Sequence, residues 1–531
     1  MTKTLVIGAG IAGLATAALL AHEGHEVHVL EMNDQVGGRA GLHERDGFRF
    51  DTGPSWYLMP RVFDHFFELL GTTTAEQLDL TFLSPSYRVF REPDTAGTSS
   101  EPLTIPLGKD QVLETFNRVE PGSAETLTTY LRSARRATDM AEKYFLYNPF
   151  TKLSSLTTRE VLGAAPELTR LLGTSLESYV AKRFTDPMLR QVLGYPAVFL
   201  GTNPADAPAI YHLMSALDLD TGVQYPMGGF WQVAERLAAL ATDAGTQITT
   251  GAEVVRIVTD GNGRKSKATG VIWTDHDGVQ HREDADIVVS CADLHHTETQ
   301  LLPPRHQSYP ERWWRKRTSG PGAVIGMLGV RGEVPELPHH SLFFTNDWHK
   351  NFDSIFGNEP QIPEPASIYV CKPSATDAGV APEGHENLFI LIPVPAETDI
   401  GHGGADGSGD VAVEQAVDMA IAQLESWAGI PDLGDRIVVR ETRGPADFAT
   451  TYHSWQGGML GPSHILSQSA LFRAQNASKK ISNLFYAGAT TAPGVGVPMC
   501  LISAELVLKR IRGDHTAGPV AAPRQVDGAN D

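Results

Sequence analysis

The sequence predicts an α/β fold in which a parallel sheet is covered on both faces. Its first thirty residues have the pattern of a strand (residues 4–7), a glycine-rich turn, a helix (residues 14–23) and a second strand (residues 27–30). Two strands joined through a helix run parallel, and parallel sheets are usually buried on both faces. A chain of 531 residues exceeds what one hydrophobic core usually supports, so we expect two or three domains.

The turn Gly8-Ala9-Gly10-Ile11-Ala12-Gly13 has the spacing of a dinucleotide-binding fingerprint. Gly8 permits the tight turn, Gly10 lets a pyrophosphate approach the backbone, and Gly13 lets helix and strand pack closely. The amino end of the helix offers unpaired N–H groups and a positive dipole to phosphates. Glu31 follows the second strand and can accept hydrogen bonds from a ribose. These features predict a Rossmann-like domain; the alternative is a glycine-rich turn that serves packing alone.

The choice between NAD and FAD depends on the segment after the second strand. Gly37-Gly38-Arg39 follows Glu31 by six residues, and its glycines again permit close backbone approach. Arg39 can place a planar cation near the pyrophosphate or the flavin. The alternative for Arg39 is a surface ion pair.

Composition excludes several classes of function. The net charge of −20 argues against a nucleic-acid partner, which would be repelled, and against attachment to anionic lipid by charge alone. The three cysteines are far apart and form no CxxC pair, which favours a reducing cytoplasm. His295-His296 and His339-His340 are adjacent pairs without zinc-ligand spacing, so we expect no metal site.

Residues 5–21 resemble the apolar region of a signal peptide, but glycines at positions 8, 10 and 13 interrupt it. No other apolar run approaches the length of a membrane span. We therefore expect a chain that is mature from Met1 and has no transmembrane segment.

The pattern changes along the chain in a way that suggests a discontinuous arrangement. Residues 59–227 are mostly helical, with candidates at 61–70, 124–144 and 177–195, and Phe63, Phe66, Phe67 and Leu70 recur at helical spacing. That stripe fits core packing or the lining of an apolar pocket. The remaining expected elements are strands at 247–250, 253–258, 270–274, 287–290, 323–329, 367–370 and 388–393, a glycine-rich loop at 400–409, and a strand, turn and helix within 483–512.

Several blocks of the sequence resemble the two-dinucleotide-binding flavoproteins related to amine oxidases, and more closely the bacterial phytoene desaturases. The resemblance covers nearly the whole chain to about residue 511, and its first and last blocks are the most specific. The blocks are FDTGP at 50–54, YPMGG at 225–229, EVVRI at 253–257, VVSCAD at 288–293, APEG at 381–384, TRGPADF at 442–448, NLFYAGA at 483–489 and PGVGVP at 493–498.

The resemblance implies a non-covalent FAD held by segments that are distant in sequence. Gly8 to Gly13, Glu31 and Arg39 would hold the ADP half, and Val254 would meet the adenine by backbone contact. Gly53 of the FDTGP block would also bind the cofactor. Around the ribityl chain and the flavin ring would lie Gly488, Gly494, Gly496, Val497 and Pro498. A Gly-x-Gly-x-Pro turn before a helix also lets bare backbone approach a flat ring, and the helix amino end favours a reduced, anionic flavin. The alternative for this turn is a connection that serves packing alone.

The same resemblance implies a domain division. An α/β, Rossmann-like FAD-binding domain with a parallel sheet would comprise residues 1–58, 226–302 and 435–513. An α+β substrate-binding region, built from insertions and in contact with a membrane, would comprise residues 59–225 and 303–434. Residues 514–531 would form a disordered tail.

The sequence departs from the bacterial pattern at two places. Met499-Cys500 replaces smaller residues after Pro498. The resemblance implies an acid and an arginine near Ala164-Ala165-Pro166, and the matching positions are Glu160 and Gly163. Because the arginine is missing, Glu160 remains only a candidate catalytic group, and catalytic side chains are otherwise unassigned.

The function implied is an FAD-dependent carotenoid desaturase acting on phytoene or its partly desaturated products, toward neurosporene or lycopene. Desaturation removes a hydride and a proton from neighbouring carbons, so orientation and a suitable flavin contribute most. Alternatives are another FAD oxidoreductase on this scaffold (a carotenoid isomerase, a saturase or an amine oxidase) and a non-catalytic isoprenoid carrier. The flavin turn argues against the carrier.

A long hydrocarbon must be collected from a bilayer, so we expect a cytoplasmic protein in peripheral, mainly hydrophobic contact with the membrane. The most membrane-like run is residues 312–317, which includes Trp313 and Trp314; the alternative is an exposed helix end. A membrane quinone or oxygen is the expected electron acceptor, because the chain has one complete dinucleotide fingerprint.

Overall fold

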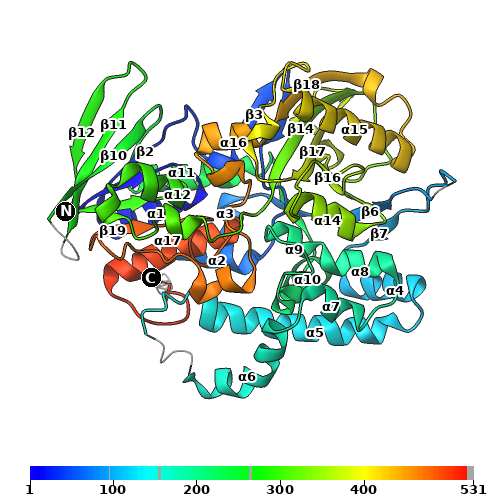
Figure 1. Ribbon diagram of the computed structural model, residues 1–531, viewed down its shortest axis with the longest axis horizontal. Coiled ribbons are helices and arrows are strands. Elements are labelled where there is room, and N and C mark those ends of the chain that lie inside the picture. Colours follow the sequence, from blue (N-terminus) through cyan, green and yellow to red (C-terminus); the bar gives the residue numbers. More distant parts are fainter. Residues whose placement is uncertain (95, 153–156, 262–265, 523–531) are drawn as a thin grey trace, which may run out of the picture.

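The computed structural model describes residues 1–94, 96–152, 157–261 and 266–522 (Figure 1). Its first layer is a five-stranded, all-parallel sheet with the strand order β19-β13-β1-β2-β9. The strands are β1 (Lys3–Ile7), β2 (Glu26–Leu30), β9 (Gln247–Thr249), β13 (Ile287–Ser290) and β19 (Leu484–Tyr486). A parallel sheet is therefore assembled from the beginning, middle and end of the chain.

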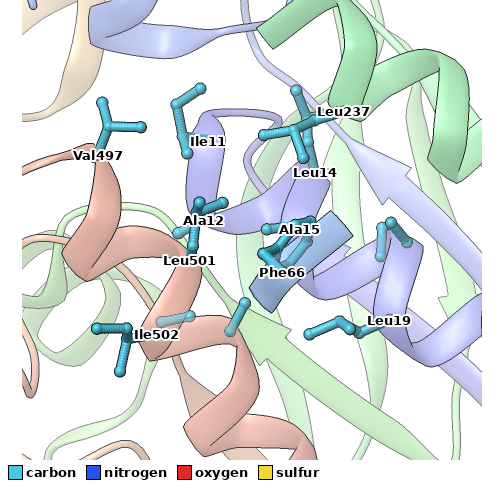
Figure 2. Packing of buried hydrophobic residues seen from close by; sticks show 14 of the residues in the cluster. Ile11, Ala12, Leu14, Ala15, Leu19, Phe66, Leu237, Val497, Leu501 and Ile502 are labelled. Atoms are coloured by element: carbon cyan, nitrogen blue, oxygen red, sulfur yellow. The ribbon is translucent and has the colours of Figure 1, made fainter. Parts of the chain in front are cut away.

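Helices cover one face of this parallel sheet, and a small antiparallel sheet covers the other. On one face α1 (Ile11–His22) packs against α11 (Trp231–Asp243), α17 (Val497–Arg512) and α2 (Pro60–Leu69), and Figure 2 shows α1 beside α17 with Phe66 and Leu237 closing the cluster. The other face packs against β10 (Glu253–Asp260), β11 (Lys267–Thr274) and β12 (Gln280–Asp284). Successive residues of β1 alternate between the two cores, as a strand buried on both faces requires.

The second large sheet has seven strands in the order β18-β14-β17-β16-β15-β6-β7. Its strands are β6 (Tyr87–Arg91), β7 (Leu103–Ile105), β14 (Gly322–Arg331), β15 (His340–Phe344), β16 (Ile368–Cys371), β17 (His385–Val394) and β18 (Ile437–Arg443). The predicted boundary at residue 435 is wrong in one respect, because β18 pairs with β14 in this sheet and not with the FAD-domain sheet. One face carries α15 (Val411–Ala428), a helix that the sequence analysis missed.

A helical layer covers the other face of the seven-stranded sheet and extends to the bottom of Figure 1. Its helices are α4 (Lys109–Val119), α5 (Ser123–Ala141), α6 (Arg159–Leu172), α7 (Leu176–Ala181), α8 (Pro187–Gly194), α9 (Pro196–Phe199), α10 (Met214–Leu219) and α14 (Trp348–Phe356). The helix expected over residues 177–195 is divided in two. Asp186 caps α8 by accepting from the Leu189 N–H, and Pro187 occupies the first helical position.

Short elements connect these layers. They are the hairpin of β3 (Leu42–Arg45) and β4 (Phe48–Asp51), the pair of β5 (Leu80–Phe82) and β8 (Gln224–Pro226), and the helices α3 (Thr74–Gln77), α12 (Leu294–His296), α13 (Glu311–Trp314) and α16 (Pro445–Tyr452).

The predicted disordered tail is wrong for residues 514–522. The buried Lys509 ammonium donates to the carbonyls of Thr516 and Gly518 at 2.7 and 2.6 Å, and the Val520 N–H donates to the Glu505 carboxylate at 2.6 Å. A buried ammonium requires acceptors, and this segment supplies two of them. Residues 523–531 lie outside the described part of the chain.

Candidate functional site

One large cavity, of about 710 Å³, runs from the glycine-rich turn into the space between the seven-stranded sheet and the helical layer. Its lining falls into three groups. The first surrounds the amino end of α1, the second is the turn before α17, and the third consists of apolar side chains from α5, α9, α14 and neighbouring loops. The cavity is large enough for a cofactor and a second molecule to share one space.

The glycine-rich turn has the geometry that a pyrophosphate site requires. A Cβ at Gly13 would lie 1.9 Å from the Gly8 carbonyl oxygen, whereas a Cβ at Gly10 would meet nothing closer than 3.9 Å. Gly13 therefore holds α1 against β1, and Gly10 leaves bare backbone facing the cavity. Because Gly10 is the N-cap and supplies no side chain, the helix amino end is open to an anion.

Glu31 and Arg39 flank this turn. The buried Glu31 carboxylate accepts from the Ala9 N–H at 2.6 Å and from the Asn33 N–H at 3.0 Å, which fixes it at the end of β2 beside the cavity. Arg39 donates to the Ser454 hydroxyl, and its Nε is buried without a hydrogen-bond partner among the described residues. A surface ion pair is thus not the role of Arg39, and its unpaired N–H suits a phosphate oxygen.

The turn before α17 approaches the same cavity. Gly488, Gly494 and Gly496 have φ values of +118°, +156° and +108°, a region that favours glycine. Val497 and Pro498 begin α17 and line the cavity, as do Gly53, Val254 and Gly488. Gly53 allows close packing, because a Cβ there would lie 2.3 Å from the Arg39 carbonyl oxygen. Of the residues predicted for the cofactor, Gly13 and Gly494 do not line the cavity, and a Cβ at Gly494 would lie 2.3 Å from the His464 ring. The other predicted residues share the cavity wall, and this cradle of exposed backbone and one orphaned donor fits FAD.

Two buried residues behind this turn were missed by the sequence analysis. The Arg473 guanidinium donates to the carbonyls of Thr491 and Ala489 at 2.9 and 2.6 Å. Among the described residues no carboxylate acts on its pKa, and burial lowers the pKa of Arg473 to about 10. His464 accepts from the Val495 N–H at 3.3 Å. Neither residue belongs to a local motif, so no sequence signal marked them.

The candidate Glu160 lies elsewhere. It is in the first turn of α6, its side chain is half-exposed, and it does not line the cavity. Its carboxylate pairs with Lys143 at 2.5 Å and accepts from the Tyr144 hydroxyl at 2.7 Å, and the Lys143 hydrogen bond lowers its pKa. This position argues against a role as acid or base.

Glu160→Gln is therefore expected to leave turnover within about twofold of wild type, because surface substitutions of this kind change stability by about 0.5 kcal/mol or less. Steady-state assay of the FAD-loaded enzyme checks this. A loss of about tenfold or more with an unchanged flavin spectrum would restore Glu160 as a catalytic candidate.

Comparison with known proteins agrees with this geometry. Residues 11–511 match the family described as flavin containing amine oxidoreductase. The chain belongs to this family. It is 38% identical over 513 residues to a carotenoid 3,4-desaturase of Haloarcula japonica, covering 96% of each chain. It is 33% identical over 526 residues to a zeta-carotene-forming phytoene desaturase of Myxococcus xanthus, covering 98% of this chain and 96% of the relative.

Solved structures show the same fold at low sequence identity. An oxidoreductase from Methanosarcina mazei aligns over 96% of this chain and all of its own, with a TM-score of 0.61 and 17% identity. A putrescine oxidase bound to putrescine aligns over 96% of this chain and 98% of its own, with a TM-score of 0.58 and 14% identity. The family and the cradle together identify the chain as an FAD-dependent oxidoreductase.

Proposed function

We propose that this enzyme introduces double bonds into a carotenoid, such as phytoene or a partly desaturated product. The supporting observation is the character of the cavity beyond the flavin turn. Its described lining residues there are mostly apolar or aromatic, including Phe199, Leu342, Phe344 and Phe352. An apolar tunnel binds a hydrocarbon by excluding water and has no polar group that the substrate would leave unpaired.

Bound FAD supplies the acceptor for a hydride. The protein contributes orientation, because the cavity walls confine an extended chain beside the turn at Gly494–Pro498. The amino end of α17 begins at that turn and stabilises negative charge near it. Exclusion of water by the apolar lining also strengthens each of these electrostatic effects.

An amine substrate is disfavoured by the distribution of charge. The carboxylates among the described lining residues are Glu31, Glu253 and Asp293, and all three lie at the nucleotide end. An ammonium group in the apolar part would therefore have no counter-ion there, which is costly. A carrier without redox chemistry would not need the open cradle around Gly10.

Expression in a phytoene-accumulating bacterial host tests the proposal. Pigments absorbing in the visible are expected, and parallel cultures supplying neurosporene or lycopene show which intermediate is used. Colourless phytoene and unchanged downstream pigments, in cells that contain soluble, flavin-loaded protein, would contradict it.

We also propose that the cavity mouth contacts a membrane. Four large apolar side chains line the cavity and are nevertheless exposed: Leu172 (40%), Leu466 (43%), Leu471 (44%) and Phe472 (56%). They come from the end of α6 and from residues 466–472. An exposed apolar rim at a hydrocarbon cavity fits insertion into the acyl boundary of a bilayer.

The run at residues 312–317 is a poorer candidate. Trp314 is fully buried and donates its indole N–H to the Tyr309 carbonyl at 2.9 Å, and Trp313 is partly buried against Arg317. Within the described residues, no helix has the length and apolarity needed to cross a bilayer.

Leu471→Asp with Phe472→Asp is expected to reduce cosedimentation with neutral vesicles by about tenfold or more, because each charge would have to enter the bilayer surface. Val279→Asp is the matched control, since Val279 is 53% exposed on a turn of the FAD domain. Equal loss in both variants, or none in the double variant, would contradict docking at this mouth.

Peripheral attachment to the cytoplasmic membrane would also place the flavin near a quinone pool, so we propose a quinone, or oxygen, as the electron acceptor.

A further inference from the structure

Two hydroxyl groups and an imidazole form a hydrogen-bonded chain in the wall of the cavity. Ser55 and Tyr369 line the cavity, whereas His340 lies behind them and is fully buried. The Tyr369 Oη lies 2.6 Å from the Ser55 Oγ and 2.8 Å from the His340 Nδ1. Ser55 follows the Gly53-Pro54 segment that lines the cofactor part of the cavity. The chain therefore leads from the cavity wall beside the segment expected to bind the cofactor to a buried imidazole.

The surroundings of His340 suit a proton acceptor. Its ring stacks on the Trp56 indole, with centroids 4.5 Å apart and planes 12° from parallel, and an indole face stabilises a cation. Among the neighbouring titratable groups, His339 and Cys371 are uncharged: burial lowers the pKa of His339 to about 3 and raises the pKa of the Cys371 thiol to about 12. The Lys372 ammonium and the Asp377 carboxylate lie near His339 and act on its pKa in opposite directions. Burial also lowers the pKa of His340 well below its usual value, so the imidazole is neutral at rest and would hold an added proton only transiently.

We propose that Ser55, Tyr369 and His340 take up the proton released during desaturation. Bound FAD would accept the hydride from one substrate carbon, and the electron pair of the adjacent C–H bond would form the double bond. The released proton adds to the Ser55 Oγ, the Ser55 hydroxyl hydrogen passes to the Tyr369 Oη, and the Tyr369 hydrogen passes to the His340 Nδ1. The reverse transfer returns the proton when water replaces the product. This assignment rests on the proposed desaturase function.

A weak base suffices for this step. Loss of hydride leaves positive charge on the substrate, which makes a proton on the neighbouring carbon strongly acidic. A chain of neutral hydroxyls can therefore pass it on, provided that a group behind them accepts the proton for the duration of the step.

Other titratable groups in the cavity wall are less suitable as proton acceptors. His464 already accepts the Val495 N–H on Nε2, and the buried Arg473 cation nearby disfavours a second charge. Tyr195 lines the cavity, but its hydroxyl donates at 2.8 Å to Asp218, which lies outside the lining. Burial raises the pKa of Asp218 to about 6, which makes the Tyr195–Asp218 pair the main competing proton acceptor.

Anaerobic mixing of FAD-loaded protein with carotenoid in vesicles tests the assignment, with bleaching of flavin absorbance as the signal. Tyr369→Phe and His340→Phe are expected to slow bleaching at saturating carotenoid by about 100-fold or more. The flavin spectrum, its midpoint potential and the half-saturating carotenoid concentration should stay unchanged. In both variants, the solvent deuterium isotope effect that the wild-type bleaching step shows should disappear. Tyr130→Phe is the control, because it removes a buried phenol hydroxyl outside the cavity.

Three results distinguish the outcomes. A bleaching rate for Tyr369→Phe within about twofold of the wild-type rate would overturn the assignment. A large loss of bleaching rate in Asp218→Asn alone would overturn it too. If Tyr369→Phe does not fold, Ser55→Ala takes its place, because it removes the entry to the same chain. If no carotenoid bleaches the wild-type flavin, the proposed function itself fails.

Discussion

Gly13→Ala is expected to give a protein that no longer retains FAD. The added Cβ would lie 1.9 Å from the Gly8 carbonyl oxygen, and neither atom belongs to a side chain that can rotate away. The amino end of α1 would have to move from β1 and from the pyrophosphate position. Overpacking of this kind costs about 1–3 kcal/mol or more. We therefore expect FAD binding to weaken by about 100-fold or more, since about 1.4 kcal/mol corresponds to a tenfold change.

Titration of apoprotein with FAD, followed by flavin fluorescence, measures this effect. Gly163→Ala is the matched control: it makes the same substitution in α6, where an added Cβ meets nothing within 4 Å. An alanine suits a helix interior, so this control should bind FAD as tightly as wild type. Equal affinities for Gly13→Ala and Gly163→Ala would show that the first turn does not hold the cofactor.

Arg473→Met is expected to lower the free energy of unfolding of the protein strongly. Its guanidinium satisfies the carbonyls of Ala489 and Thr491 on the segment leading to the flavin turn, and also that of Pro462 at 3.2 Å. Removing the donors leaves these carbonyls without their partner in a dry environment, and each unsatisfied group costs about 1–3 kcal/mol. We expect about 3 kcal/mol or more of destabilisation, together with earlier release of FAD on heating.

Denaturant unfolding followed by flavin fluorescence measures this loss. Arg473→Lys separates charge from geometry, because lysine keeps the cation but replaces the planar guanidinium fork with a compact ammonium that has fewer donors. A partial recovery of stability is expected. A midpoint for Arg473→Met equal to that of wild type would contradict the structural role assigned to Arg473.

The parts of this fold that were predictable are those encoded locally. Residues 3–22 combine a strand, the glycine-rich turn and a helix, and each element was placed nearly as found. Tertiary context decided the remainder. Residues 411–428 form a helix covering the seven-stranded sheet, where strands and loops were expected. Strand β18 was expected to belong to the FAD domain. Only its pairing with β14, which the local sequence does not reveal, assigns it to the other sheet.

Some residues of the candidate site could likewise be predicted from local sequence, and others could not. Glu31 and Arg39 follow the glycine turn closely enough for sequence spacing to indicate them. Tyr369 and His340 come from separate strands and meet Ser55 only through the packing of the second sheet. The adjacent pair His339-His340 was the one available signal, and it was considered only for metal binding. Trp314 shows the opposite case, because aromatic and basic residues indicated a surface where the structure buries the ring.

The central claim is that one cavity holds the flavin at its glycine-lined end and a hydrocarbon in its apolar part. Anaerobic titration of the FAD-loaded protein with vesicle-borne carotenoids tests it most directly, with one spectrum reporting both partners. The flavin band should be lost in proportion to a shift of carotenoid absorption to longer wavelength. A flavin that stays oxidised with every carotenoid, yet is reduced by an aliphatic amine, would contradict the claim.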